Sequence, residues 1–213
     1  MRNIIIVGDS FCCGNGWPDI LANKLDMNLI QCGFPGNHWW AVRDFLINLK
    51  PEKFDNSDII IFVHTHPDRI PTLTSDLSKV NCSRLGNLNE IEMAVKLYYS
   101  YIHDGDFLNW IMHKWFEEIS QKWVRLKTVH LHGFQESWPY RHLLNGMNVG
   151  PDLIGISLDE LRDPSPGLFT DRRRNHFNEF NNEELANQLY HAIVNYQLQD
   201  FNLDVTKFQK GVS

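Results

Sequence analysis

The chain has 213 residues, of which 43% are hydrophobic and 12% aromatic, and this composition is enough to build one folded domain with a substantial core. The net charge of -6, with no basic run beyond residues 172–174, excludes an electrostatic surface for nucleic acid, so we expect no nucleic-acid partner. Because no segment approaches the ~20 apolar residues of a membrane span and the first residues lack a signal-peptide pattern, the sequence predicts a cytoplasmic protein with no membrane span.

Short apolar runs alternate with segments of helical spacing along the chain. Runs of strand length occur at residues 3–7, 28–32, 58–63 and 127–132, with a less clear fifth run at 153–157. Residues 18–26 and 39–49 carry apolar side chains at helical spacing between the first three runs. This order predicts a flavodoxin-like, three-layer α/β/α sandwich with a parallel sheet of about five strands.

The interval between the third and fourth strands is too long for one crossover helix. Residues 89–102 and 106–124 have the pattern of two amphipathic helices, and we expect a helical-hairpin insertion over residues 86–126. Its aromatic residues are more typical of a core than of a substrate wall or a dimer face.

The last helix is predicted from Asn181 and Glu184, which have the spacing of a cap pair before an apolar face. The sequence therefore indicates a single domain over residues 1–200, followed by a C-terminal tail over residues 201–213.

A serine follows the first predicted strand directly, in the run Gly8-Asp9-Ser10. A strand of a parallel sheet carries the next residues to the carboxyl edge, where Gly8 and Gly14 permit a sharp turn with free backbone N–H groups. This is where a serine nucleophile would lie, although Gly-Asp-Ser is also ordinary turn chemistry.

The residues at the predicted strand ends resemble those of the SGNH or GDSL hydrolases. The first block of that family is matched by Gly8-Asp9-Ser10 with Gly14, the oxyanion glycine of the second block by Gly36, and the histidine of the last block by His176. The resemblance implies that Ser10 is the nucleophile, that His176 is the base, and that the N–H groups of Ser10 and Gly36 bind the oxyanion. It implies hydrolysis of a small-molecule, glycan or lipid ester without a cofactor or metal.

Two positions depart from the pattern of the family. Arg173 stands where the family has an aspartate, so either Asp171 orients the imidazole or the site is a Ser-His dyad. His66 stands at the position of the oxyanion asparagine and would donate in its place. A third block rewritten in this way, around Pro67 and Arg69, is similar to the phage-encoded branch of the superfamily.

Other polar and aromatic residues at the same edge are candidates for contact with substrate. They are Asp9, Asn37, His132 and Trp138, with Trp39 or Trp40 as further candidates for the wall of the cleft. Arg69 and the run 172–174 would suit an acidic group on a substrate.

Two alternative functions remain open from the sequence. One is a catalytically degraded domain that serves as a binding or virion-structural module, because two family positions are replaced. The other is a metal site, because His64 and His66 end the third strand and His130 and His132 end the fourth. Four cysteines fit neither a disulfide framework nor a Cys-x-x-Cys site. The sequence does not indicate the oligomeric state.

Overall fold

The fold was analysed in a computed structural model of the chain. The structure describes residues 2–12, 16–33, 37–66, 69, 90–123, 125–134, 145–158, 177–195 and 200–210, with the backbone alone at residues 31, 32, 91, 92, 95, 120 and 158.

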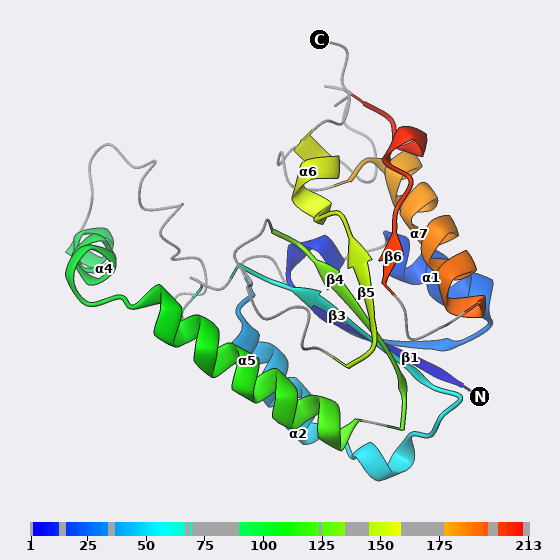
Figure 1. Cartoon of the computed structure of the whole chain (residues 1–213), viewed down its shortest axis with the longest axis horizontal. Coiled ribbons are helices and arrows are strands. Elements are labelled where there is room, and N and C mark those ends of the chain that lie inside the picture. The colour runs from blue at the N-terminus through cyan, green and yellow to red at the C-terminus, as the bar shows by residue number, and fades with distance from the viewer. Residues whose placement is uncertain are drawn as a thin grey trace.

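A parallel sheet forms the middle layer of the molecule (Figure 1). Its strands are β1 (Asn3–Gly8), β2 (Asn28–Gly33), β3 (Ile59–His64), β4 (Lys127–His132), β5 (Met147–Gly150) and β6 (Phe201–Asn202). They lie in the order β2-β1-β3-β4-β5-β6, with every neighbouring pair parallel. The helices are α1 (Trp17–Leu25), α2 (Trp39–Asn48), α4 (Glu90–Tyr101), α5 (Gly105–Lys122), α6 (Leu153–Leu158) and α7 (Glu179–Val194). The three-layer α/β/α arrangement expected from the sequence is confirmed.

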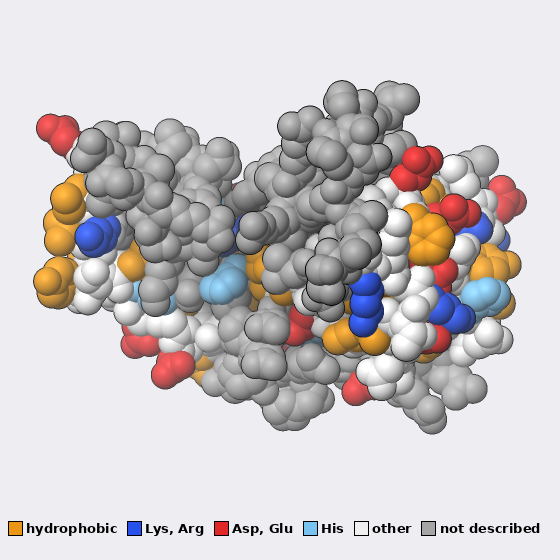
Figure 2. All heavy atoms as spheres, turned by 90° about the horizontal axis from the view of Figure 1, so that it is seen from above, with side chains coloured by type: hydrophobic (Ala, Val, Ile, Leu, Met, Phe, Trp, Pro, Cys, Tyr) orange, Lys and Arg blue, Asp and Glu red, His pale blue; other side chains and the backbone are white. Residues whose placement is uncertain are grey.

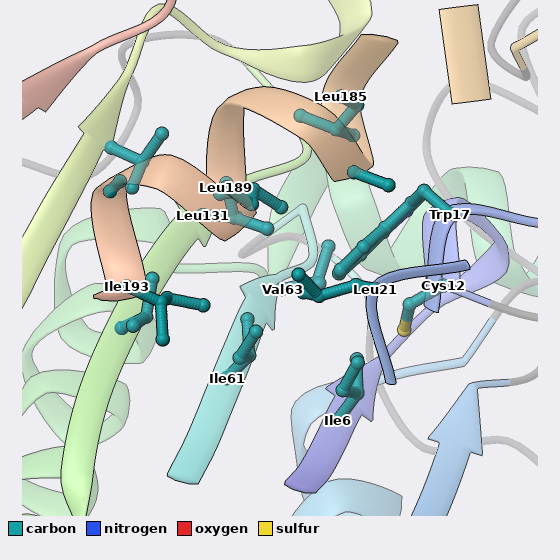
Figure 3. Close-up of a cluster of buried hydrophobic side chains, with 14 of the residues drawn as sticks. Ile6, Cys12, Trp17, Leu21, Ile61, Val63, Leu131, Leu185, Leu189 and Ile193 are labelled. Carbon is teal, nitrogen blue, oxygen red and sulfur yellow. The ribbon is translucent and has the colours of Figure 1, made fainter. Parts of the chain in front are cut away.

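Helices α1 and α7 cover one face of the sheet. Figure 3 shows Trp17 and Leu21 of α1 and Leu185 and Leu189 of α7 gathered over the strands, and all four are buried in one hydrophobic cluster. The strands supply every second residue to this cluster, since side chains alternate between the two faces of a sheet. A strand that is buried on both faces appears in the sequence as a continuous apolar run, which is why β1 and β3 could be predicted from the sequence.

Helices α2 and α5 cover the opposite face. Met112, Trp115, Phe116 and Ile119 of α5 are buried against strand residues of that face. The prediction that the aromatic stripe of this segment belongs to the core is therefore confirmed for α5. This helix is a layer of the sandwich and makes the crossover into β4, whereas the sequence suggested that it was part of an inserted hairpin.

Helix α4 leaves several of its apolar side chains exposed to solvent. Met93, Leu97 and Tyr101 are exposed, and hydrophobic side chains gather at the end of the molecule where α4 lies (Figure 2).

Residues 153–157 form a helix, and the prediction of a strand there was wrong. The fifth strand is β5, which precedes it, and Leu153 and Ile156 of α6 are buried one turn apart. A short apolar run does not distinguish a buried strand from a buried helical turn, because both bury nearly every side chain.

Residues 201–210 of the predicted C-terminal tail pack onto the rest of the domain. Strand β6 pairs with β5 and makes the sheet six-stranded, where about five strands were expected. Leu203 and Phe208 are buried in the cluster beneath α7. Strand β6 has only two residues, and a strand of that length leaves no periodic pattern in the sequence.

The cap of α7 lies three residues before the predicted one. The side chain of Asn178 accepts a hydrogen bond from the Asn181 backbone N–H at 2.8 Å, so Asn178 is the N-cap. The side chain of Asn181 is fully buried and joins Gln209, from whose backbone N–H its Oδ1 accepts at 2.7 Å.

Candidate active site

Ser10 lies at the carboxyl end of β1, in a 3₁₀ turn that spans Ser10–Cys12. Strand β1 lies between β2 and β3. The chain after β1 continues to α1 on one face of the sheet, whereas the chain after β3 continues through α4 to α5 on the other face. The chain therefore diverges to opposite faces beside Ser10, at the kind of switch point where α/β sheets bind ligands. The side chain of Ser10 is largely buried, with 5% of its residue surface exposed.

Two glycines allow the turn to sit against its neighbours. A Cβ added to Gly8 would lie 2.5 Å from the Val63 carbonyl oxygen, and one added to Gly33 would lie 2.6 Å from the Cys12 carbonyl carbon. Both approaches are too close for any side chain, so the ends of β1 and β2 require glycine for packing. The backbone N–H of Cys12 donates to the Asp9 carbonyl at 3.1 Å and closes the turn.

The carboxylate of Asp9 is fully buried beneath this turn, with 0% exposure. Its Oδ1 accepts from the Phe11 backbone N–H at 3.1 Å, and its Oδ2 accepts from the Thr65 hydroxyl at 3.0 Å and from Arg69 Nη1 at 2.9 Å. Each carboxylate oxygen is thus directed to partners within the protein, and a contact of Asp9 with substrate stays a prediction. A buried carboxylate without such partners would be strongly destabilising.

Burial raises the pKa of Asp9, and the Arg69 guanidinium opposes this by lowering it, as do the hydrogen bonds from Phe11 and Thr65. The pKa of Asp9 lies above its ordinary value because the loss of hydration is the largest effect. Arg69 thus favours the charged form of Asp9, together with these hydrogen bonds.

Asn37 also points into the protein. Its Nδ2 donates to the Gly8 carbonyl at 2.7 Å, its backbone carbonyl accepts from Arg69 Nη1 at 3.0 Å, and 7% of its surface is exposed. The Asn37 side chain thus links the loop after β2 to the end of β1, and its predicted contact with substrate stays a prediction. The side chain is engaged because an unpaired amide at this depth would carry a desolvation penalty.

His66 lies half-buried after β3. Its ring contacts the ring of Phe134 edge-on, with 5.7 Å between centroids, and its backbone carbonyl accepts from the Arg69 N–H at 3.1 Å. Its role as an oxyanion donor stays a prediction.

His132 is buried, with 4% exposure, and its contact with substrate stays a prediction. It is opposite His64 in the pairing of β3 and β4, and the two rings stack with 4.9 Å between centroids. His64 Nε2 and His130 Nδ1 lie 2.9 Å apart, and His130 Nε2 lies 2.9 Å from the Asn145 carbonyl oxygen. Side chains two apart on a strand share a face, which brings these three rings together.

The metal hypothesis correctly predicted that β3 and β4 are neighbours and that their histidines gather. The rings of His64 and His130 hydrogen-bond directly to each other in place of converging on a common point. Among the residues that the structure describes, no three His, Cys, Asp or Glu side chains are arranged to hold a metal ion.

Several predicted site residues lie outside the described residues. These are His176, Asp171, Gly36 and Trp138, together with Gly14 and Arg173. The residue after His176 is described: Phe177 is buried, and its ring lies 5.9 Å from that of Phe11, centroid to centroid. The chain directly after position 176 therefore contacts the chain directly after Ser10.

Trp39 belongs to the core and is 2% exposed. With Phe62, His64, Met112 and Phe116 it lines a small cavity beneath α2 and α5. Sequence reasoning missed the roles of Thr65 and Arg69 as partners of Asp9. The sequence offered only a weak signal, an acidic residue directly after the strand, since a carboxylate that is buried there needs a compensating cation.

No family model and no curated protein matches the sequence. Among solved structures, the chain is similar to the lipase/acylhydrolase from Enterococcus faecalis, with a TM-score of 0.32 and 14% identity over 64% of this chain. The similarity covers 60% of that chain, so the present chain spans only part of its length. None of the helices in the described part of the chain is long and apolar enough to cross a membrane.

Proposed function

We propose that this chain is a serine-dependent ester hydrolase in which Ser10 is the nucleophile and His176 is the general base. The observation that carries the proposal is the contact between the rings of Phe11 and Phe177 at 5.9 Å. Each of these residues is one peptide bond from a proposed catalytic residue, and consecutive Cα atoms are about 3.8 Å apart. Phe11 and Phe177 lie 166 positions apart in the sequence, and their contact supports a pairing of Ser10 with His176.

The proposed reaction proceeds through an acyl-enzyme. His176 removes the proton from the Ser10 hydroxyl, and the oxygen attacks the ester carbonyl. The N–H groups of Ser10 and Gly36 and the imidazole of His66 stabilise the oxyanion. His176 then protonates the departing alcohol, and water releases the acyl group with the same residue as base. Asp171 orients the imidazole if a third member exists, and otherwise the site is a dyad.

The turn geometry supports Ser10 in this role. The 3₁₀ turn is closed by the Asp9 backbone and capped by the Asp9 carboxylate, so the position of Ser10 is set by a rigid, buried framework. Catalytic groups are most effective when the surrounding residues hold them in place before substrate binds.

The test is labelling with a fluorophosphonate probe and turnover of p-nitrophenyl acetate across a range of pH. The wild-type chain should be labelled at Ser10, and Ser10→Ala and His176→Ala should each lose turnover on the order of 10³-fold or more. Ser57→Ala is the matched control, since Ser57 is exposed in a loop and its hydroxyl bonds to Asp55.

Absence of both labelling and turnover in the wild-type chain would disprove the hydrolase. An inert Ser10 combined with saturable binding of a glycan or protein would then favour the binding module. Efficient turnover that depends on Ser10 would exclude that alternative.

A further inference from the structure

Arg69 joins the three loops that surround Ser10. Its Nη1 lies 2.9 Å from Asp9 Oδ2, 3.0 Å from the Asn37 carbonyl oxygen and 2.9 Å from Thr65 Oγ1. These oxygens belong to the loops after β1, β2 and β3. One nitrogen therefore holds three segments that are distant in the sequence, and the Thr65 hydroxyl completes the cluster because it also lies within 3.1 Å of the Asn37 carbonyl.

We propose that Arg69 is a positioning residue of the active site, which holds the Ser10 turn in its reactive position through the carboxylate of Asp9. This inference rests on the proposed function, because it assigns Arg69 to the same serine. Arg69 acts on the nucleophile through Asp9 and makes no contact with substrate in this role.

The link from Asp9 to Ser10 runs through the turn itself. Asp9 accepts hydrogen bonds from two backbone N–H groups of the turn. Phe11 donates to the Asp9 carboxylate and Cys12 donates to the Asp9 backbone carbonyl, each with 3.1 Å between nitrogen and oxygen. Ser10 lies between Asp9 and these two donors. A shift or rotation of Asp9 would therefore move the serine.

A second contact reaches the turn from the other side. The Arg69 guanidinium lies over the ring of Phe134, with 4.9 Å from Cζ to the centroid, and Phe134 packs edge-on against Phe11 at 5.6 Å. Arg69 thus touches both partners that fix the turn, through a cation–π contact on one side and an ion pair on the other.

The ion pair is buried, which makes the arrangement sensitive to loss of the cation. The Asp9 side chain is 0% exposed and that of Arg69 is 14% exposed, whereas the other ion pairs between described residues lie on the surface. Removing one partner of a buried pair leaves an uncompensated charge. Without Arg69, burial would be opposed only by hydrogen bonds such as those from Phe11 and Thr65, so the pKa of Asp9 would rise further.

Other titratable groups near the pair are few among the described residues. The Cys12 thiol donates to the Asp9 backbone carbonyl at 3.3 Å. His38, the N-cap of α2, has its pKa lowered by burial and, to a smaller extent, by Arg69. The Thr65 hydroxyl does not titrate between about pH 5 and about pH 8. The ring of His66 packs edge-on against Phe134. The variant His38→Asn keeps a side-chain acceptor at the N-cap of α2, so it shows whether the titration of His38 contributes to the pH dependence.

The experiment compares Arg69→Met, Arg69→Lys, Asp9→Asn and the double variant Arg69→Met/Asp9→Asn in the full chain. The rate of Ser10 labelling by the fluorophosphonate and the thermal midpoint are both measured from about pH 5 to about pH 8. Arg43→Met is the matched control, because the ion pair of Arg43 with Asp44 is exposed and 3.8 Å long.

Arg69→Met should slow labelling on the order of 10²-fold and lower Tm by roughly 10 °C at the alkaline end. Its loss of Tm should shrink towards acid pH, because a neutral Asp9 no longer needs a counter-ion. The double variant should label no more slowly than the slower single variant, and its loss of Tm should not vary with pH. Arg69→Lys keeps the charge but loses the planar guanidinium that lies over the Phe134 ring, so it should label severalfold more slowly with near-normal Tm.

The outcomes separate the two proposals. If the wild-type chain is not labelled, the hydrolase is disproved, and the positioning role is disproved with it. If the wild-type chain is labelled and both Arg69→Lys and Asp9→Asn label at the wild-type rate, the hydrolase stands and the positioning role is wrong. Additive effects of Asp9→Asn and Arg69→Met on labelling would also overturn it, even if Arg69→Met alone folds poorly.

Discussion

The Nε2 atom of His64 lies 2.9 Å from the Nδ1 atom of His130, and both rings are buried between β3, β4 and α5. His130 Nε2 faces a carbonyl oxygen, that of Asn145, and must therefore be the protonated nitrogen of a neutral ring. His130 Nδ1 then accepts, and His64 donates from Nε2. The chain of bonds thus selects one tautomer for each of two neutral histidines.

This pair predicts a loss of stability at acid pH. Burial lowers the pKa of His130 from 6.5 to about 4, and burial together with His132 and His130 lowers the pKa of His64 well below its ordinary value. The unfolded chain binds protons on these groups before the folded chain does, so stability is full above about pH 6.5 and falls as the pH decreases towards 4. For His130 alone the loss approaches about 3 kcal/mol.

Urea unfolding at several pH values checks this expectation. His130→Gln removes one titrating group and should reduce the acid loss by up to about 3 kcal/mol, whereas His191→Gln on the exposed side of α7 should leave the curve in place. An unchanged acid profile in His130→Gln would show that His130 is not neutral in the folded state.

Gly33→Ala should destabilise the protein by about 1–3 kcal/mol. The added Cβ would lie 2.6 Å from the Cys12 carbonyl carbon and would displace the turn of Ser10, so labelling should fall as well. Gly155→Ala is the matched control, because a Cβ there meets nothing within 4 Å. In helix α6 this control should be neutral or more stable by about 0.5–1 kcal/mol. Equal effects at the two glycines would contradict the packing described for Gly33.

Asn182→Ala should cost about 1–3 kcal/mol. The Oδ1 of Asn182 accepts from the first N–H of α1, that of Trp17, at 2.8 Å, where the N-cap residue Gly16 supplies no side-chain acceptor. Its Nδ2 donates to the carbonyls of Phe177 and Asn178 at 3.1 and 2.9 Å. The same amide thus supports the start of α1 and the chain after His176, and Ser10 labelling should slow together with the loss of stability. Asn195→Ala, which removes an exposed bond to the His191 carbonyl, should change neither measurement.

Phe208→Ala should cost about 3–5 kcal/mol, because the ring is buried and packs near Phe177 at 6.4 Å between centroids. Val205→Ala, at a position with 37% exposure, should cost less than about 0.5 kcal/mol. Chemical denaturation measures both. Equal, small effects would mean that the C-terminal segment is only loosely attached.

The strands that could be predicted are those buried on both faces over a full run. Ile4–Val7 and Ile59–Val63 contain almost no polar residue, and their bounds in the structure differ from the predicted ones by a residue at most. Strand β5 is only four residues long and β6 only two, and such lengths leave no period to detect. Their place in the sheet follows from neighbours that are distant in the sequence.

In the candidate site, too, some features follow from the local sequence and others from contacts with distant residues. Gly8-Asp9-Ser10 after an apolar strand placed the serine at the carboxyl edge, because the direction of a parallel strand determines where the next residue emerges. The burial of Asp9, Asn37 and His132 was not predictable, since a polar side chain at a strand end can face either solvent or the protein.

From the sequence alone came the α/β class, the first four strands and a serine at the edge of the sheet, because each depends on a local run of residues and its period. Only the tertiary structure decided that Asp9 is buried against Arg69, that Phe11 meets Phe177 and that the last segment completes the sheet. These are contacts between residues far apart in the chain, and the energy of burying a charge or an aromatic ring depends on what surrounds it in space.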